Sequence, residues 1–306
     1  MIDVSLRVLR YFVAAADNGN VTLAARALRV SQPSISLAIT QLEEKLNTQL
    51  FVRQHSRGIA LTPAGMEVLR EARKLLAHVN DFAVGVAGDR QEIRGTLSVG
   101  CLSYLVPRYL AGILKSFAIQ YPHVDVSFRD GDQSDLIRGM INGQLEVVLT
   151  YDWLLPKPFT TEMLLELPPY LLIPSNHRLK PRRAIHLREM ADEPCVLLDL
   201  TISRDYFTSI FGSLGLTPNI RYRTVSVEAV RSLVSNGLGY SILTVPSKTS
   251  TTYDGRRLAT LRLLDSLQPV RIASVHLSEH KLRAVAQAFL ASARGFFRRE
   301  AGMRGS

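Results

Sequence analysis

The sequence is poor in cysteine and tryptophan: its 306 residues include two cysteines and one tryptophan. Cys101 and Cys195 stand far apart, so they form no disulfide framework and suit a reducing compartment. No apolar run approaches the roughly 20 residues that a membrane-spanning helix needs, and no apolar segment follows a basic start. We therefore expect a cytoplasmic protein with no membrane partner.

Motifs of common enzymes are also missing. The patterns GxSxG, GxGxxG and the P-loop do not occur. The histidines at positions 55, 78, 123, 177, 186, 276 and 280 show no HExxH or other close metal-ligand spacing. We expect no enzyme, no metal and no cofactor, and an active site dispersed over the two-lobed fold described below stays open as an alternative.

Net charge and length limit the kinds of partner and the number of domains that the chain can have. The net charge of +10 favours a polyanionic partner, although acidic residues are mixed with the basic ones over the first 60 positions. A chain of this length is expected to fold as two or three domains. Nucleic acid is thus a candidate partner that other features must support.

The most informative stretch is residues 20–46. Asn20 is expected to cap a first helix, Arg29–Ser31 to make a turn, and Ser31 to cap a second helix with Pro33 in its first turn. The second helix buries one face, made of Ile35, Ala38, Ile39, Leu42 and Leu46. Its other face is largely polar and uncharged, so it can enter a DNA major groove. The alternative is an ordinary helical hairpin, with Ala24, Ala25 and Leu28 as the apolar stripe of its first helix.

The flanking segments extend this unit. Residues 4–17 are predicted to form a supporting helix, and Leu50–Arg53 and Ile59–Leu61 two short strands around a turn. This hairpin is predicted to be a wing that places Arg53 and Arg57 beside the phosphate backbone. A solvated surface hairpin is the alternative.

A long helix is predicted from Thr62–Pro63 onward, with Thr62 as its cap and Pro63 at its first position. Apolar residues recur there with a heptad spacing over about three heptads, at Leu69, Leu76, Ala83 and at Ala72, Val79, Val86. We expect this seam to pair with a second copy of the chain. A helix that lies on its own domain is the alternative.

The first 65 residues resemble the LysR-type transcriptional regulators. The matching positions are Leu6, Leu9, Phe12, Ala16, Ala24–Leu28, Ser31–Ser36, Ile39, Leu42–Glu43, Leu46, Leu50–Phe51, Arg53 and Leu61–Gly65. The resemblance implies a winged helix-turn-helix whose DNA-binding candidates are Thr22, Gln32, Pro33, Ser34, Ser36, Leu37, Thr40, Arg53 and Arg57. Leu37 departs from the family, where many members carry arginine, and a thymine methyl contact is possible there instead. Asn47, where members usually carry glycine, is expected to end the recognition helix in a left-handed conformation.

The resemblance also implies the assembly and its partners. A homodimer or a homotetramer built as a dimer of dimers would bind an interrupted palindrome of double-stranded DNA, with RNA polymerase as a further candidate partner. A small organic effector would shift the arrangement of the subunits on DNA. An alternative is a small-molecule-binding protein whose helix-turn-helix serves assembly only.

Beyond glycines at 85, 88 and 95 the pattern changes to alternating strands and helices. A parallel β-α-β-α-β unit is predicted over 96–150, a crossing near 151–158, a second α/β lobe, and a closing helix over 279–299. The layout resembles the periplasmic-binding-protein-like effector domain of the same family. The predicted fold class is therefore multidomain, α plus α/β. Its domains are 1–62 (winged helix-turn-helix), 63–92 (linker and dimerisation helix) and 93–306 (effector domain, with lobe I over 93–155 and 265–306 and lobe II over 160–262).

Ligands of open parallel sheets bind beyond the carboxyl ends of the strands. The loops there supply the effector-binding candidates Ser103, Tyr104, Asp132, Gln133, Thr150, Tyr151, Asp199, Thr201, Ser203 and Thr224. These groups suit a small polar or anionic molecule with an apolar part. The alternatives are local roles: helix caps for the serines, a turn former for Asp132, core-edge aromatics for the tyrosines, and a surface position for Arg204. A redox pair of Cys101 and Cys195 is disfavoured because they stand in different predicted lobes, whereas a disulfide needs Cα atoms within about 7 Å.

Overall fold

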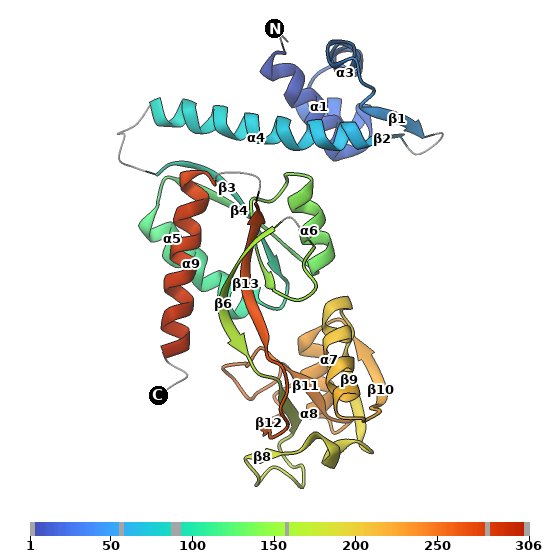
Figure 1. Cartoon of the computed structure of the whole chain (residues 1–306), viewed down its shortest axis with the longest axis vertical. Coiled ribbons are helices and arrows are strands. Elements are labelled where there is room, and N and C mark those ends of the chain that lie inside the picture. Colours follow the sequence, from blue (N-terminus) through green and yellow to red (C-terminus); the bar gives the residue numbers. More distant parts are fainter. Residues whose placement is uncertain (1–3, 55–57, 87–92, 157–158, 279–281, 303–306) are drawn as a thin grey trace.

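The computed structural model describes residues 4–54, 58–86, 93–156, 159–278 and 282–302. The molecule is elongated (Figure 1): a helical N-terminal domain and a long helix α4 lie at one end, and two α/β lobes follow along the long axis. The predicted fold class is confirmed. No helix among the described residues is long and apolar enough to cross a bilayer.

The N-terminal domain contains α1 (Leu6–Asn18), α2 (Val21–Leu28) and α3 (Gln32–Leu46). Asn20 caps α2, because its Oδ1 accepts hydrogen bonds from the amides of Thr22 at 2.8 Å and Leu23 at 3.1 Å. Ser31 caps α3, and Asn47 ends it with φ of 49°. The caps, the turn and the end of the recognition helix are thus as predicted.

Packing in this domain differs from the prediction at one position. Ala24 and Ala25 are buried, but Leu28 is 38% exposed, so the stripe on α2 is narrower than predicted. The wing is an antiparallel pair of β1 (Phe51–Gln54) and β2 (Gly58–Leu61), in which Phe51 lies opposite Leu61. Phe51 and Phe12 pack with ring centroids 5.4 Å apart, which joins the wing to α1.

Helix α4 (Pro63–Val86) begins as predicted, with Thr62 Oγ1 accepting from the amide of Gly65 at 2.9 Å. The prediction that its heptad seam faces a second copy is wrong for the first two residues of the seam. Leu69 and Ala72 are each 3% exposed within the core of the N-terminal domain, so they are not free to face a second copy. The side chains of Ala83 and Val86 lie outside the described set. The apolar residues that α4 does expose include Leu75 and Phe82.

Lobe I is a five-stranded sheet in the order β4-β3-β5-β13-β6. Strands β3 (Gly95–Leu102), β4 (Val124–Gly131) and β5 (Val147–Tyr151) are parallel, as predicted, whereas β13 (Val270–Leu277) runs antiparallel to both β5 and β6 (Phe159–Leu167). The helices are α5 (Ala111–Gln120), entered through a π-helical turn at Val106–Leu110, α6 (Gln133–Ile141) and α9 (Ala284–Gly302). Helices α5 and α9 pack side by side and α6 lies apart from them (Figure 1). The closing helix was predicted from 279, but residues 279–281 lie outside the described ones.

Lobe II holds a four-stranded sheet in the order β11-β7-β12-β8 and a parallel pair of β10 and β9. Its elements are β7 (Tyr170–Pro174), β8 (Ala184–Ile185), a 3-10 turn at Leu187–Met190, β9 (Pro194–Leu198), α7 (Thr201–Ser213), β10 (Asn219–Thr224), α8 (Val227–Ser235), β11 (Ser241–Leu243) and β12 (Leu258–Leu263). The amide of Val196 donates to the carbonyl of Tyr240 at 2.8 Å, so β9 runs beside the start of β11. The sequence pattern missed β8 and the 3-10 turn, which are too short to show a periodicity.

The boundary between the lobes lies later than predicted. Strand β6 was expected to begin lobe II, but it pairs with β13 along its whole length, from Phe159 to Leu167, and so belongs to lobe I. Pro168 and Pro169 then separate β6 from β7, because neither proline can donate a hydrogen bond to a strand ladder. The chain first crosses there and returns between β12 and β13.

Candidate DNA interface and effector site

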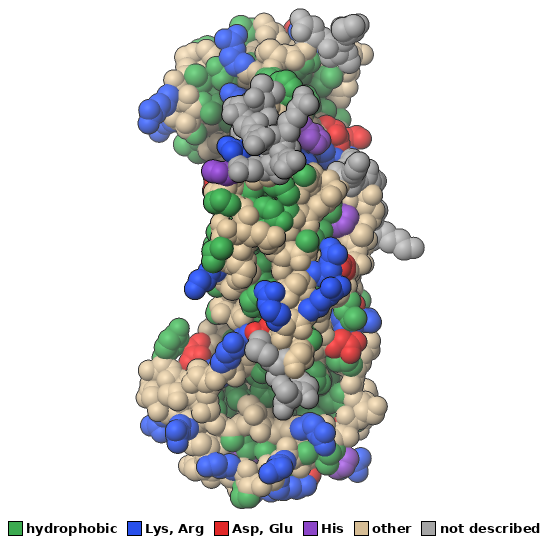
Figure 2. Space-filling model, turned by 90° about the vertical axis from the view of Figure 1, so that its left-hand side faces the viewer, with side chains coloured by type: hydrophobic (Ala, Val, Ile, Leu, Met, Phe, Trp, Pro, Cys, Tyr) green, Lys and Arg blue, Asp and Glu red, His purple; other side chains and the backbone are tan. Residues whose placement is uncertain are grey.

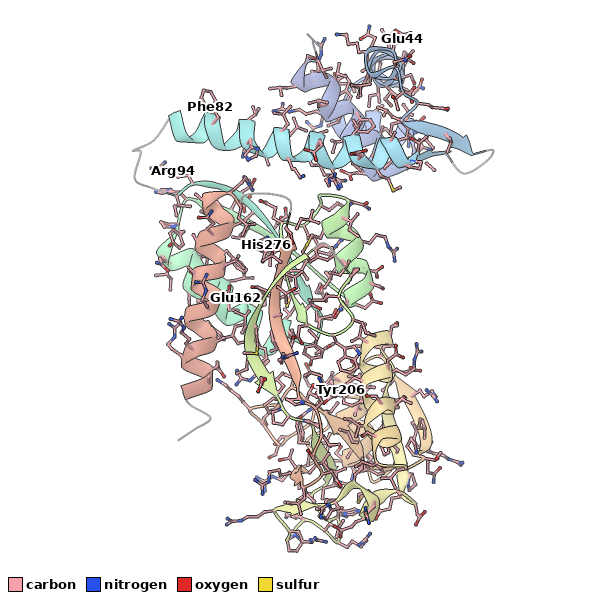
Figure 3. All side chains as sticks on the ribbon, in the orientation of Figure 1. Glu44, Phe82, Arg94, Glu162, Tyr206 and His276 are labelled. Carbon is pink, nitrogen blue, oxygen red and sulfur yellow. The ribbon has the colours of Figure 1, made fainter. Side chains whose placement is uncertain are left out.

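The outward face of α3 is polar and accessible. Gln32, Pro33, Ser34, Leu37 and Thr40 are exposed, and Ser36 is half-buried between them. Gln32 Nε2 donates to Ser36 Oγ at 2.8 Å, and Thr40 Oγ1 donates to the Ser36 carbonyl at 3.1 Å. Leu37 is 60% exposed, so its side chain is not part of the core. Helix α3, which carries Glu44, lies on the side of the domain away from the lobes (Figure 3).

Two features hold this face rigidly. Ile35 and Leu42 are almost fully buried beneath it. At the far end, Glu43 Oε1 accepts from the amides of Leu50 at 2.7 Å and Phe51 at 3.0 Å, which ties α3 to the wing. A surface fixed in this way can present its groups in a set geometry.

The remaining predicted DNA contacts are less completely described. Thr22 is exposed in the first turn of α2. The backbone of Arg53 pairs with Ile59 in the wing, but its side chain lies outside the described set, and Arg57 lies outside the described residues altogether. Basic side chains are not gathered at one end of the molecule: on the face in Figure 2 many lie over the lower lobe. The net charge of the whole chain therefore does not by itself mark a DNA surface.

Several predicted effector residues do come together between the lobes. The rings of Tyr104, from the loop after β3, and Tyr151, at the end of β5, lie 5.6 Å apart. Tyr151 reaches across to lobe II, where its hydroxyl and Thr244 Oγ1 lie 2.9 Å apart and share a hydrogen bond. Ser203 is buried in α7, close enough to Tyr104 to lower the pKa of that phenol slightly against the effect of burial. Burial raises the pKa of both phenols, so they remain neutral hydroxyls at physiological pH.

A second set of polar groups lies beside these tyrosines. Thr150 Oγ1 donates to Gln133 Oε1 at 2.8 Å, and Gln133 Nε2 donates to the carbonyl of Trp153 at 2.8 Å. The Trp153 ring packs edge-on against Tyr206 of α7, with centroids 5.7 Å apart. Its indole Nε1 is buried and has no hydrogen-bond partner among the described residues, so it is a donor that a bound molecule could satisfy.

Other predicted effector residues have local roles. Asp132 caps α6, with Oδ1 accepting from the amide of Asp135 at 3.0 Å, and this hydrogen bond is the main cause of its lowered pKa. Asp199 forms ion pairs with Arg204 and Arg223, and Thr224 Oγ1 accepts from the amide of Ser226. Ser103 and Thr201 are exposed. Of the residues that meet between the lobes, the sequence did not single out Trp153, Tyr206 and Thr244. The lone tryptophan, within the predicted crossing near 151–158, was the available signal.

The two cysteines are poorly placed for redox chemistry. Both are buried, and burial raises the pKa of Cys195 to about 12 and also raises that of Cys101. A thiolate is the reactive form of cysteine, so both thiols are expected to be inert in the folded protein. No cluster of histidine, cysteine and acidic residues that could hold a metal occurs in the described part of the chain.

Comparison with known proteins agrees with this layout. The family described as bacterial regulatory helix-turn-helix protein, lysR family, matches residues 6–66, and the LysR substrate binding domain matches residues 90–298. The uncharacterized HTH-type transcriptional regulator YnfL of Escherichia coli is 32% identical over 246 residues, which are 79% of this chain and 82% of that protein. The transcriptional dual regulator GltC of Bacillus subtilis is 30% identical over 255 residues, 81% of this chain and 83% of its own. The crystal structure of HinK, a LysR family regulator from Pseudomonas aeruginosa, superposes with a TM-score of 0.65 at 34% identity, covering 96% of this chain and 99% of that one.

Proposed function

Because the chain belongs to the LysR family of bacterial transcriptional regulators, we propose that the outward face of α3 reads operator DNA and that the region between the lobes around Tyr104, Tyr151 and Trp153, here called the cleft, binds the controlling effector. The N-terminal domain is the DNA-binding unit and the two lobes form the effector-binding domain of a regulator, not an enzyme. The observation that carries the proposal is a rigid, exposed polar helix face at one end and a set of buried, neutral hydrogen-bonding groups between the lobes. Work on chromosomal DNA would place the protein in the cytoplasm.

On the DNA side, the groups on α3 favour direct reading of bases. Gln32, Ser34 and Ser36 offer amide and hydroxyl groups to base edges, and Leu37 offers an apolar surface to a thymine methyl group. Arg53 and Arg57 in the wing would contact phosphates and position the domain. Pairing of two chains would present two such helices to the half-sites of an interrupted palindrome, and two pairs would make a tetramer. RNA polymerase is a further proposed partner of the DNA-bound protein.

On the effector side, the described cleft groups are hydroxyls, an amide and an indole N–H. Tyr104, Tyr151 and Ser203 can donate to a ligand, as can Trp153 Nε1, while the aromatic rings supply apolar surface. The matching effector is a small molecule with an apolar body and a hydrogen-bond acceptor, for which a carboxylate is one suitable group. Its binding would compete with the hydrogen bond between Tyr151 and Thr244 that joins the lobes.

Helix α6 offers a physical route from the cleft to the DNA-binding domain. Gln133, in its first turn, binds the cleft residue Thr150. Just beyond its other end, the carbonyl of Asn142 accepts a hydrogen bond from Arg73 of α4, and Arg73 also pairs with Asp17 of α1. A shift of α6 would therefore act on α4 and α1 together. Such coupling requires an effector that favours one arrangement over the other.

The experiment is a binding titration of the full chain with the DNA upstream of its own gene, at several salt concentrations. Ser36→Ala and Arg53→Gln are expected to weaken operator binding by about 1–3 kcal/mol each while the oligomer is retained. Arg221→Gln, at an exposed strand arginine of lobe II, is the matched control and should bind like the parent. Unchanged operator affinity in both α3 and wing variants would refute this reading surface, and a retained oligomer with no specific DNA binding would favour a helix-turn-helix used for assembly only.

A further inference from the structure

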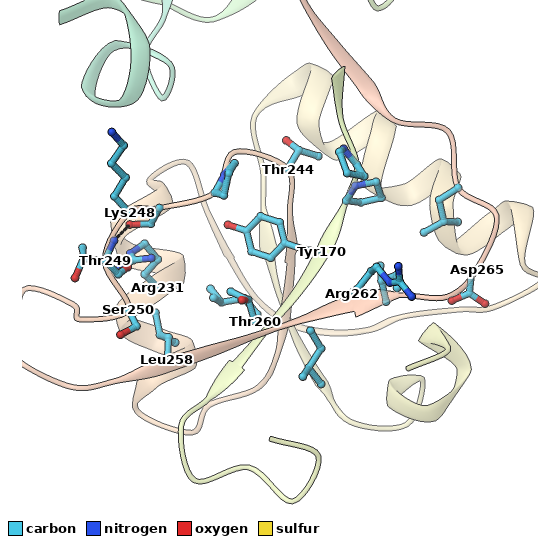
Figure 4. Close-up of a pocket in the computed structure, with 18 residues that line it drawn as sticks. Tyr170, Arg231, Thr244, Lys248, Thr249, Ser250, Leu258, Thr260, Arg262 and Asp265 are labelled. Atoms are coloured by element: carbon cyan, nitrogen blue, oxygen red, sulfur yellow. Dashed lines mark hydrogen bonds between the residues drawn. The ribbon is translucent and has the colours of Figure 1, made fainter. Parts of the chain in front are cut away.

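Lobe II contains a pocket of about 700 Å³ (Figure 4). We call it the hinge pocket. It lies over β7 and β12 and is closed by the segment after β11, and none of Tyr104, Tyr151 and Trp153 lines it. Its volume is within the range of roughly 300–1,000 Å³ that is usual for small-molecule sites.

The floor of the hinge pocket is apolar and its walls are well fixed. Apolar surface comes from residues of both strands and of the adjoining segments: Leu172, Leu258, Leu263, Leu267, Pro168, Pro169 and Pro246. Tyr170 stands among them (Figure 4), and its hydroxyl donates to the carbonyl of Val245 at 3.0 Å, which holds the closing segment in place. Burial raises the pKa of Tyr170 to about 12, so this hydrogen bond does not change near neutral pH.

Three of the four charged residues that line the pocket are cationic, and the other polar lining residues carry hydroxyl groups. Arg231 is 6% exposed; its Nε pairs with Glu228, and its Nη2 donates to the carbonyls of Thr249 and Thr251, which leaves Nη1 without a partner in the described chain. The Arg262 guanidinium has no acidic partner among the described residues, and Lys248 is 73% exposed, 3.9 Å from Glu300.

One acidic residue lines the pocket, and its charge is already engaged. Asp265 Oδ1 lies 3.1 Å from His186 Nδ1, and Oδ2 accepts from the amide of Leu187 at 2.7 Å. The lining thus combines an apolar floor with an excess of positive charge. Such a lining suits a molecule that is apolar at one end and anionic at the other.

We propose that the hinge pocket is a second ligand site, for a small amphipathic anion such as a carboxylate on an aromatic or short aliphatic body. The apolar part lies over the leucines of β7 and β12, and the anionic group meets the cations at one edge of the pocket: Arg262 on one side of Tyr170, or Nη1 of Arg231 and Lys248 on the other (Figure 4). The site does not depend on which molecule binds between the lobes.

A ligand in the hinge pocket is placed where it can change the arrangement of the two lobes. Pro168 and Pro169 belong to the first crossing between the lobes, and Asp265 and Leu267 to the second. Thr244 also lines the pocket, and its Oγ1 shares the hydrogen bond with Tyr151 of lobe I. A ligand here contacts both crossings and the residue that joins the lobes, so it provides a second regulatory input. This consequence, unlike the binding itself, rests on the proposed function.

The test uses isothermal titration calorimetry of the full chain with 1-naphthoate and, as its uncharged counterpart, 1-naphthalenemethanol. We expect 1-naphthoate to bind more tightly. The double variant Lys248→Gln/Arg262→Gln should weaken naphthoate binding about 10-fold and leave the alcohol unchanged. Thr260→Trp, at an exposed pocket residue of β12, should place an indole over the leucines of the pocket and weaken binding of both probes.

Two controls separate this site from the cleft and from general charge effects. Arg221→Gln removes one exposed arginine of lobe II away from the pocket and should bind both probes normally. Trp153→Phe alters a residue between the lobes that neither lines the pocket nor contacts Thr244 in the described chain, and it should also bind normally, which keeps this test independent of the proposed effector site. Naphthoate binding that is lost in Trp153→Phe but kept in Thr260→Trp would overturn the proposal, as would no binding at millimolar concentration to the parent chain. Circular dichroism checks that Thr260→Trp is folded, and the glutamine variants decide the question if it is not.

Discussion

The hydroxyl of Tyr151 shows how much one atom contributes to the arrangement of the lobes. Tyr151 and Thr244 are 93 positions apart in sequence and belong to different lobes, yet their hydroxyls share a buried hydrogen bond of 2.9 Å. A buried hydroxyl that loses its partner keeps the desolvation cost without the bond. The contact therefore favours the arrangement in which the lobes touch.

Tyr151→Phe should lower the free energy of unfolding by about 1–2 kcal/mol, because the phenylalanine leaves the Thr244 hydroxyl without its partner. Urea unfolding followed by circular dichroism measures the change. Tyr253→Phe is the matched control, since Tyr253 is 94% exposed and the same atom is removed there into water. Equal stability of the two variants would show that the hydrogen bond between the lobes adds nothing.

The thiol of Cys195 gives a prediction with a defined pH window. Burial raises its pKa from 9.0 to about 12 in the folded chain, so folding favours the neutral thiol. This contribution to stability is fully present below about pH 9, the pKa of the unfolded chain, and is lost as the pH rises toward 12. At pH 8, Ellman's reagent should react slowly with the native protein and fast in denaturant. Rapid modification of the native protein would contradict the buried placement of both cysteines.

Among the elements, α6 and α4 are joined most directly by Arg73. Its side chain is 11% exposed and bonds both the carbonyl of Asn142 and the carboxylate of Asp17. Desolvation lowers the pKa of Arg73, and the negative charge of Asp17 partly opposes that effect. Gly143 lies beside it with φ of 67°, and a Cβ there would meet the backbone of Arg70 at 3.4 Å. The turn after α6 thus fits closely against α4.

Arg73→Gln should destabilise the chain by about 1–3 kcal/mol, because it leaves Asp17 and the Asn142 carbonyl without their partner. Arg26→Gln, at an exposed position of α2, is the control and should change stability by no more than about 0.5 kcal/mol. Urea unfolding midpoints compare the two. A midpoint for Arg73→Gln equal to that of the control would remove α6 as a route between cleft and DNA-binding domain.

Assembly is a property of the whole molecule, and α4 supplies its most exposed apolar side chain in the described N-terminal part. Phe82 is 72% exposed and points away from lobe I (Figure 3). Leu69 and Ala72 pack inside their own domain, so pairing through α4 would use its later turns. An exposed phenylalanine on a helix favours a partner surface.

Phe82→Glu should shift the oligomer toward smaller species in sedimentation velocity, because a carboxylate would have to be buried in the paired helices. Operator affinity should fall with it, since one DNA-binding domain alone contacts one half-site. Val225→Glu, at a 66% exposed apolar residue of lobe II, is the matched control. If Phe82→Glu and Val225→Glu gave the same distribution of oligomers, the interface would lie elsewhere.

Local features of this chain followed from the sequence alone. The caps at Asn20, Ser31 and Thr62, the left-handed end at Asn47 and the parallel strands β3, β4 and β5 were all predicted. The family resemblance rested on the same N-terminal residues and was confirmed. These features depend on residues a few positions apart, or on a repeating apolar pattern, so they are visible before folding.

The tertiary structure decided what depends on distant parts of the chain. Strand β6 joined lobe I because it pairs with β13, more than 100 residues later, and Leu69 turned inward because α1 packs against α4. The cleft contact of Tyr151 with Thr244 and the hinge pocket, which draws on residues from Pro168 to Leu267, arise in the same way. Partners separated by long loops are chosen by packing and hydrogen bonding in three dimensions, and a one-dimensional pattern does not record which residues will meet.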